Sequence, residues 1–245
     1  MPEDERPPAA ADLSPAEWLA LLRRGALELV GRMPWSSNAT FLVTVRGDRL
    51  GRAVYKPAGG ERRLWDFPAG LYRREVAAYE LSEALGLGVV PETVLRSDGP
   101  LGEGSLQRFV EADFEQHYFS LLEDERYHAA LRRVAGFDLL ANNADRKGGH
   151  LLVDRAGRVY AIDNGLCFHA QAKLRTVMWD FAGEPLPGEL LAGCEALARR
   201  VPEAVASLLS PEESEALARR ARALLELGTF PAPASGERPY PWPLV

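Results

Sequence analysis

The chain has 245 residues, 47% hydrophobic and 26% charged, which is the composition of an ordinary soluble globular protein with one large core or two smaller lobes. Its net charge of −6 argues against a general nucleic-acid or anionic-membrane binder, and no apolar run is long enough to form a transmembrane segment. The two cysteines exclude a disulfide framework and lack zinc-ligand spacing, which fits a cytoplasmic protein. From the negative net charge we expect no nucleic-acid partner.

The N-terminal part of the sequence predicts a leader, a helix and a hairpin. Residues 1–13 are predicted to be a disordered leader, because charged residues are followed by Pro and Ala without an apolar signal core. A helix is expected from Ser14, where a capping box coincides with proline at the first helical position. Residues 41–46 and 50–56 flank Gly47-Asp48 and predict a β-hairpin.

The next segments complete a small sheet around one helix. Apolar residues at helical spacing predict a helix over residues 71–85 that ends at Gly86. Short strands are expected near residues 89–95 and 105–110. The first half of the chain is therefore predicted to be β-rich.

The character of the sequence changes after Glu111. Residues 118–141 form one long stretch with helical periodicity, and residues 151–153 and 159–162 are expected to form a second hairpin. Helices are predicted over roughly 187–200 and over 211–227, the latter behind a second capping box. The second half is therefore predicted to be mainly helical.

The order of these elements predicts the fold class. We expect an α+β, two-lobed protein-kinase-like fold, with a β-rich N-lobe over residues 14–110 and a mainly helical C-lobe over residues 111–245. A nucleotide would bind in the cleft between the lobes. The proline-rich tail after Phe230 is expected to be irregular, with Tyr240 and Trp242 docked on the body.

Two acidic sites joined by the second hairpin carry the main functional prediction. Asp163 follows an apolar strand and begins an Asn164-Gly165 turn, and Asp145 lies 18 residues earlier. In phosphoryl transfer, one such residue orients the attacking hydroxyl and the other holds a divalent metal against the nucleotide phosphates. We assign Asp145 to the first role and Asp163 to the second. A simple hairpin turn is the alternative for Asp163 taken alone.

The residues after Asp145 add to this prediction. Arg146 is assigned a catalytic role in neutralising transition-state charge, and the following glycines permit close backbone approach. His150 is a candidate metal ligand, although imidazole suits Mg²⁺ less well than oxygen does. A buried histidine that bridges backbone groups is the equally weighted alternative.

Candidate nucleotide-binding residues lie in the first half. Lys56 ends the second strand of the first hairpin, where it can reach the α- and β-phosphates, and Glu75 on the following helix can orient it. Ser36, Ser37 and Asn38 lie in a turn placed to cover phosphates, although it lacks the Gly-x-Gly pattern. A surface lysine, a solvated glutamate and an ordinary polar turn are the alternatives.

The extended segment 105–111 precedes the change of character. Its position suits a connection that offers backbone N–H and C=O groups to adenine, so Gln107, Phe109 and Val110 are assigned to the nucleotide site. The alternative is a plain edge strand.

Together these motifs resemble the phosphatidylinositol 3/4-kinase-related family, in particular the type II phosphatidylinositol 4-kinases and an actinobacterial branch of bacterial relatives. The resemblance covers residues 36 to about 168 and rests on Val54-Tyr55-Lys56-Pro57, Arg74-Glu75, Gln107-Arg108-Phe109-Val110-Glu111, Asn143-Ala144-Asp145-Arg146 and Ala161-Ile162-Asp163-Asn164-Gly165-Leu166.

The resemblance implies a role for each matching position. It implies that Lys56 binds phosphates and Glu75 orients it, that Phe109 and Val110 line the adenine site, and that Asp145 is catalytic and Asp163 binds metal.

The chain also departs from that family. The asparagine that the family carries five residues after the catalytic aspartate is His150 here, and the cysteine-rich palmitoylated segment of the eukaryotic lipid kinases is absent.

We therefore expect a phosphotransferase that uses ATP with Mg²⁺ or Mn²⁺ and acts on a hydroxyl of a small polyol, a lipid headgroup or a protein. The second hypothesis is a pseudokinase that binds nucleotide as a regulator without turnover, motivated by His150 and the glycine-free phosphate loop.

Overall fold

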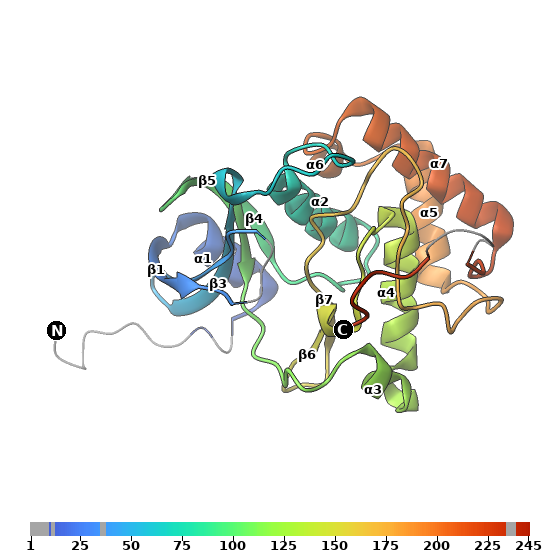
Figure 1. Ribbon diagram of the computed structural model, residues 1–245, viewed down its shortest axis with the longest axis horizontal. Helices are drawn as coiled ribbons and strands as arrows, with labels where there is room; N and C mark the ends of the chain where they lie inside the picture. Colours follow the sequence, from blue (N-terminus) through green and yellow to red (C-terminus); the bar gives the residue numbers. More distant parts are fainter. Residues whose placement is uncertain (1–9, 11–12, 35–37, 234–238) are drawn as a thin grey trace. The chain divides into compact units, whose positions relative to one another are not determined.

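The computed structural model describes residue 10 and residues 13–34, 38–233 and 239–245. Residue contacts divide the chain into two compact units (Figure 1). Unit 1 comprises Met1–Val76 and Pro91–Phe109, and unit 2 comprises Ala77–Val90 and Val110–Val245. One boundary therefore falls between Phe109 and Val110, inside the connection to which the adenine site was assigned.

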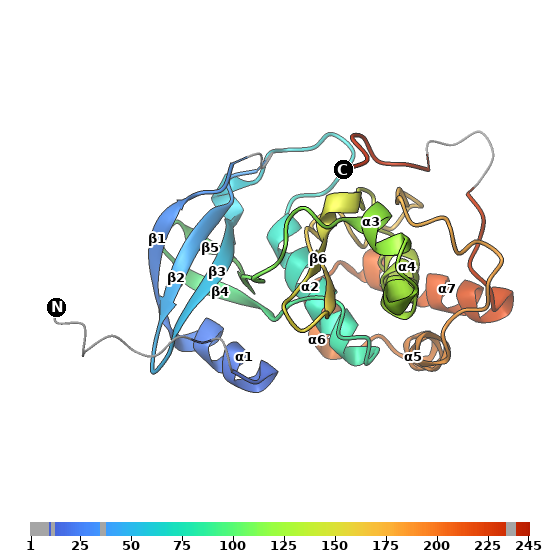
Figure 2. The ribbon, with the colours of Figure 1, turned by 90° about the horizontal axis from the view of Figure 1, so that it is seen from below.

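Unit 1 is built on a five-stranded antiparallel sheet with the order β1-β2-β3-β5-β4 (Figure 2). Its strands are β1 (Ala26–Arg32), β2 (Phe41–Arg46), β3 (Leu50–Pro57), β4 (Thr93–Gly99) and β5 (Gly102–Arg108). The predicted hairpin is confirmed as β2 and β3, which pair from Phe41 with Tyr55 to Arg46 with Leu50.

Helix α1 (Pro15–Arg24) packs on this sheet through an apolar face. The predicted capping box is present, since the Ser14 side chain accepts from the Glu17 amide and the Glu17 side chain accepts from the Ser14 amide. Arg96 on β4 donates to the carbonyls of Leu22 and Gly25 at the C-terminal end of α1. These bonds tie the helix to the sheet. The core beneath α1 is made of Trp18, Leu21, Leu22, Val43, Val45, Ala53, Tyr55, Val94 and Leu106.

Three features of unit 1 differ from the prediction. Strand β1 was not predicted, because as an edge strand it leaves most side chains exposed and shows no alternating burial. Strand β4 begins later than expected because Pro91 cannot donate to a ladder. Ala10, assigned to a disordered leader, is buried and donates to the carbonyl of Leu50. The rest of that leader, apart from Leu13, lies outside the described residues.

Helix α2 (Leu71–Ala84) begins in unit 1 and continues into unit 2, and a 3-10 turn, η2 (Ala58–Gly60), precedes it. The predicted end is confirmed, because Gly86 adopts the left-handed conformation with φ of 66°. In unit 2 the end of this helix is held by Ser82, whose hydroxyl accepts from the amides of Val89 and Val90.

The single long helix predicted over residues 118–141 is broken into α3 (Tyr118–Leu122), a 3-10 turn η3 (Glu125–Tyr127) and α4 (His128–Ala141). The break falls in the polar run of residues 123–126. There the Asp124 side chain accepts from the Arg126 amide and starts the turn. Eight of the 14 residues of helix α4 are buried.

In the rest of unit 2 the predicted hairpin and the two predicted helices are present, whereas the short helix Glu203–Ala206 was not predicted. A 3-10 turn, η4 (Gly148–His150), leads into the hairpin β6 (Leu151–Val153) and β7 (Val159–Ala161). Helices α5 (Gly188–Arg199), α6 (Glu203–Ala206) and α7 (Pro211–Leu227) follow, with the second capping box at Ser210. Helix α7 packs along α5 and against α4.

The tail was predicted to dock through Tyr240 and Trp242, which is wrong. These side chains are 50% and 87% exposed, whereas Pro241 between them is buried. In the part of the chain that the structure describes, no helix has the length and apolar character needed to cross a membrane.

Candidate active site

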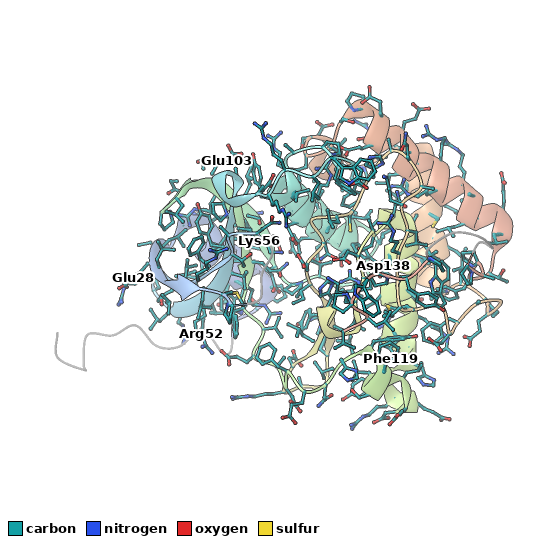
Figure 3. The ribbon with its side chains drawn as sticks, in the orientation of Figure 1. Glu28, Arg52, Lys56, Glu103, Phe119 and Asp138 are labelled. Carbon is teal, nitrogen blue, oxygen red and sulfur yellow. The ribbon has the colours of Figure 1, made fainter. Side chains whose placement is uncertain are left out.

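An ion pair in unit 1 brings together the two residues predicted to handle phosphates. Lys56 lies near the end of β3, opposite Ser105 of β5, and its ammonium group bonds to the carboxylate of Glu75 on α2. The Glu75 side chain is 3% exposed and the Lys56 side chain 22% exposed. Figure 3 labels Lys56 on the sheet. The buried Glu75 carboxylate thus fixes the position of the Lys56 ammonium group.

The other candidate nucleotide residues of unit 1 have mixed outcomes. Ser36 and Ser37 lie outside the described residues. Asn38 accepts from the Arg62 amide at 2.9 Å, so its side-chain oxygen ties the turn to the segment after η2. The buried Gln107 side chain donates to Thr93 Oγ1 at 2.9 Å, and its backbone lies in β5 between β3 and β4, so the residue is held by the sheet.

The end of the same connection is packed on both sides of the unit boundary. In unit 1 the Arg52 guanidinium lies over the Phe109 ring, and the Phe109 amide donates to the Arg52 carbonyl. In unit 2 Val110 packs with Leu152 and Tyr160. Both assigned residues are therefore held in fixed positions by their own unit.

In unit 2, helix α4 delivers the segment that carries Asp145. The helix ends at Asn142, which adopts the left-handed conformation with φ of 53°. Next, the Asn143 side chain accepts from the Asp145 amide at 2.9 Å and donates to Asp138 at 3.2 Å. This local network fixes the direction in which the chain leaves the helix.

The position of Arg146 corrects the catalytic role assigned to it. Its side chain is fully buried and forms an ion pair with the fully buried Asp138 of α4 at 2.9 Å. It also donates to the Ile162 carbonyl and the Asn164 side chain, both at 2.6 Å. Burial alone would lower the pKa of Arg146, but Asp138 and the other acidic neighbours together raise it. A guanidinium so enclosed positions other residues instead of meeting a substrate.

Arg146 thereby joins the two acidic sites. It follows Asp145 directly, and its partners Ile162 and Asn164 flank Asp163. A single buried cation therefore sets the position of both predicted functional carboxylates. Figure 3 labels Asp138, which anchors this cation from α4.

The electrostatics of Asp145 reflect its surroundings. Burial raises the pKa of the Asp145 carboxyl, the negative charge of Asp163 raises it further, and Lys147 opposes both effects. The Lys147 ammonium lies 3.0 Å from the Asp145 carboxylate. A raised pKa caused by burial and a like charge is the kind of perturbation found at functional sites.

His150 and Asp163 lie side by side. The His150 Nε2 atom is 3.6 Å from Asp163 Oδ2, and the Asp163 side chain is 55% exposed. The Nδ1 atom of His150 accepts a hydrogen bond from the Lys147 amide at 3.4 Å. The bond to the Lys147 amide agrees with the alternative prediction for His150, a histidine that bonds to backbone groups. The other ring nitrogen faces Asp163, the candidate metal ligand.

These donors fit Mg²⁺ or Mn²⁺ only as a partial coordination shell. Among the described residues no group of three or more His, Cys, Asp or Glu side chains gathers as a metal site. Mg²⁺ commonly keeps several waters and takes one or two carboxylates plus substrate phosphates. The exposed Asp163 carboxylate suits that pattern. Its negative charge raises the pKa of Asp145.

Backbone strain gathers in the same region. In the part of the chain that is described, the non-glycine residues with positive φ are Asn142, Asp163 and Phe168. Each costs of order 1–3 kcal/mol and persists only where the surroundings hold it. All three lie in the segment that carries the two acidic sites.

Sequence reasoning missed three positioning residues: Asp138, Asn143 and Asn164. Asp138 had a visible signal, since it is an isolated acidic residue in the apolar run of α4, and buried acidic residues are rare unless paired. The two asparagines belong to the motifs that carry the resemblance, but no feature of the sequence gave them a positioning role.

Comparisons with known proteins agree with this architecture. The Golgi casein kinase with Mn/ADP bound superposes with a TM-score of 0.54 at 14% identity, covering 86% of this chain and 74% of that one. A hydra Fam20 structure with sugar gives a TM-score of 0.54 at 14% identity, covering 88% of each chain. The predicted kinase-like α+β fold is thus confirmed. The link to phosphatidylinositol kinases stays a prediction.

Sequence comparison gives a much nearer relative. No protein-family model matches the chain. Protein Rv2133c of Mycobacterium tuberculosis is 43% identical over 263 aligned positions, which cover 91% of this chain and 94% of that protein. The chain therefore belongs to the family of Mycobacterium tuberculosis protein Rv2133c.

Proposed function

We propose that this protein is an ATP-dependent phosphotransferase that uses Mg²⁺ or Mn²⁺ and acts on a hydroxyl acceptor. The observation that carries the proposal is the ion pair between Lys56 on β3 and Glu75 on α2. In protein kinases an ion pair between a strand lysine and a helix glutamate must be in place for catalysis. In a kinase-like fold with this ion pair, the buried Glu75 orients Lys56 so that its ammonium group can bind the nucleotide phosphates.

Each unit supplies part of the machinery in this proposal. Lys56 contacts the α- and β-phosphates as a point charge, and backbone groups near Phe109 and Val110 receive adenine. Asp145 accepts the proton of the acceptor hydroxyl as the acceptor oxygen bonds to the γ-phosphorus. The bond from that phosphorus to the bridging oxygen breaks, and ADP leaves.

The divalent cation would be held by Asp163, with His150 beside it. Such a cation neutralises charge on the phosphate oxygens and fixes their orientation. The Mn/ADP-bound state of the structurally similar Golgi casein kinase supports a nucleotide with a divalent metal in this fold. Asp163 holds its carboxylate outward, and Arg146 fixes the residues on either side of it.

One observation favours a second function, nucleotide binding without turnover. His150 Nε2 lies 3.6 Å from Asp163 Oδ2, where a protonated imidazole would neutralise the carboxylate and compete with the cation. A regulatory pseudokinase of this kind would still bind ATP through Lys56.

The two functions separate in a paired measurement on wild type and Asp163→Asn. Thermal unfolding is followed with ATP, alone and with Mg²⁺ or Mn²⁺, and ATP consumption is followed in parallel. Ligand at one hundred times its dissociation constant stabilises by about 2.7 kcal/mol, which is readily seen as a raised Tm.

The phosphotransferase predicts metal-dependent ATP consumption that falls at least 100-fold in Asp163→Asn. A nucleotide-dependent shift with no consumption in either protein assigns the regulatory function. No nucleotide-dependent shift at all would contradict both.

A further inference from the structure

The chain's own residues 239–245, called here the C-terminal segment, lie against the segment that carries Asp145. The Thr176 amide and the Trp179 indole N–H both donate to the Pro239 carbonyl, at 2.9 and 3.2 Å. The Gly148 amide donates to the Leu244 carbonyl at 2.7 Å. Figures 1 and 2 both show the dark-red end of the chain beside the yellow turn that precedes β6.

Both anchor points are tied to the catalytic segment. Gly148 lies three residues after Asp145. At the other anchor, the Arg146 amide donates to the Arg175 carbonyl at 3.0 Å, and the Val177 amide donates to the Arg146 carbonyl at 3.1 Å. One anchor of the C-terminal segment therefore lies at Gly148, and the other lies on chain bonded to Arg146, the residue next to Asp145.

The contact is made mainly by main chain. Two backbone carbonyls accept the anchoring bonds, and Pro241 is buried between them. By contrast, Trp242 is 87% exposed. The segment has neither helical nor strand structure. The surface beneath it therefore binds an irregular backbone, with bends at Tyr240, Trp242 and Pro243, and one small apolar residue.

Gly148 shows how closely the segment approaches. A Cβ placed at Gly148 would lie 3.3 Å from the Leu244 carbonyl oxygen and 3.3 Å from the Phe119 ring, whose position Figure 3 labels on α3. The absence of a side chain at Gly148 thus leaves room for a passing polypeptide.

We propose that Gly148 and the stretch Thr176–Trp179 form a docking site for an irregular polypeptide segment of a protein acceptor, and that the C-terminal segment occupies it in the resting protein. This inference rests on the proposed function and names its acceptor class, a hydroxyl-bearing side chain of a protein. Because the segment is part of the same chain, it competes at an effective concentration of about millimolar. An acceptor must displace it before transfer.

The test displaces the C-terminal segment by variants that leave Gly148 and the stretch Thr176–Trp179 unchanged. Pro241→Asp places a charge where a buried proline now packs, which disfavours the docked state. Trp242→Asp adds the same charge one residue away on an exposed side chain and is the matched control. A chain ending at residue 238 is a second way to free the site.

Binding is measured first, because it needs no catalysis. A fluorescent peptide with the sequence of residues 239–245 is titrated by anisotropy into each protein. We expect it to bind Pro241→Asp and the shortened chain at least tenfold more tightly than wild type or Trp242→Asp. Equal binding by all four proteins, or none, overturns the inference.

Transfer from labelled ATP to a mixture of Ser-, Thr- and Tyr-containing peptides is measured next. The inference predicts at least a fivefold higher rate for Pro241→Asp than for Trp242→Asp. Peptide binding without ATP turnover keeps the docking site and contradicts the proposed function. Turnover that labels phosphoinositide vesicles or inositol but no peptide keeps the function and overturns the polypeptide assignment.

Discussion

The surroundings of Asp145 in the folded protein favour the neutral form of its carboxyl group. Burial and the charge of Asp163 raise the pKa of this carboxyl despite the nearby Lys147 ammonium. The folded state therefore binds more protons at Asp145 than the unfolded state does, whose carboxyl titrates near ~3.9. Stability must then fall as pH rises from that value through the raised pKa. Keeping a charged carboxylate here costs stability at neutral pH.

We predict that Asp145→Asn raises the Tm of the metal-free protein at pH 7, because it removes this buried charge. The difference from wild type should shrink when the pH is lowered from 7 to about 4, since the protonated fraction of wild-type Asp145 rises over that range. Thermal unfolding of both proteins at the two pH values measures the effect, with Asp48→Asn in the exposed β2–β3 turn as control. A Tm difference that is unchanged by pH would contradict this account of Asp145.

His150 and Asp163 illustrate where residue-level reasoning was strong and where it was limited. The apolar strand and following turn drew attention to Asp163, and the structure gives it a φ of 58° and an exposed carboxylate. Sequence also singled out His150, but only the structure shows its ring beside that carboxylate. Arg146 was misassigned because motif position does not reveal that a side chain is fully buried.

Among the elements, α4 and the β6–β7 hairpin depend on one buried ion pair. Arg146 joins Asp138 of α4 to the Ile162 carbonyl and Asn164 after β7. Because the Arg146 and Asp138 side chains are both fully buried, loss of either charge leaves the other without compensation.

We predict that Arg146→Met destabilises the protein by about 3–5 kcal/mol, since it strands the Asp138 charge in the core. The double variant Asp138→Leu/Arg146→Met should regain part of that loss, because no unpaired charge remains. Urea unfolding of the three proteins measures both effects. Arg133→Met, which breaks an exposed pair with Glu189, should cost at most about 1 kcal/mol. A double variant as unstable as Arg146→Met would argue against the stranded charge as the cause.

Prediction of the elements succeeded where local signals were strong. Capping boxes at Ser14 and Ser210 and the left-handed Gly86 fixed helix ends to within a residue or two. Strand β1 was missed because it is an edge strand that pairs, among the described strands, only with β2, and its mostly exposed side chains carry no alternating pattern. The division of the 118–141 stretch depends on one side-chain cap at Asp124, which periodicity does not detect.

At the scale of the whole molecule, a β-rich half followed by a helical half was enough to predict a kinase-like fold. The similarity to the Golgi casein kinase and Fam20 structures confirms that fold at 14% identity. At that identity it shows the fold alone, and the acceptor has to be inferred from the chain itself. The C-terminal segment provided that inference because tertiary contacts, not sequence motifs, bring it beside Gly148.

The central claim is that this chain moves the γ-phosphoryl group of ATP to an acceptor. The most direct test incubates wild type, Lys56→Met and Asp163→Asn with γ-labelled ATP, Mg²⁺ and a cell extract, and then separates lipid, protein and small-molecule fractions. We predict label in the protein fraction with wild type, reduced at least 100-fold in both variants. Label that stays in ATP, or leaves it as pyrophosphate, would contradict the claim.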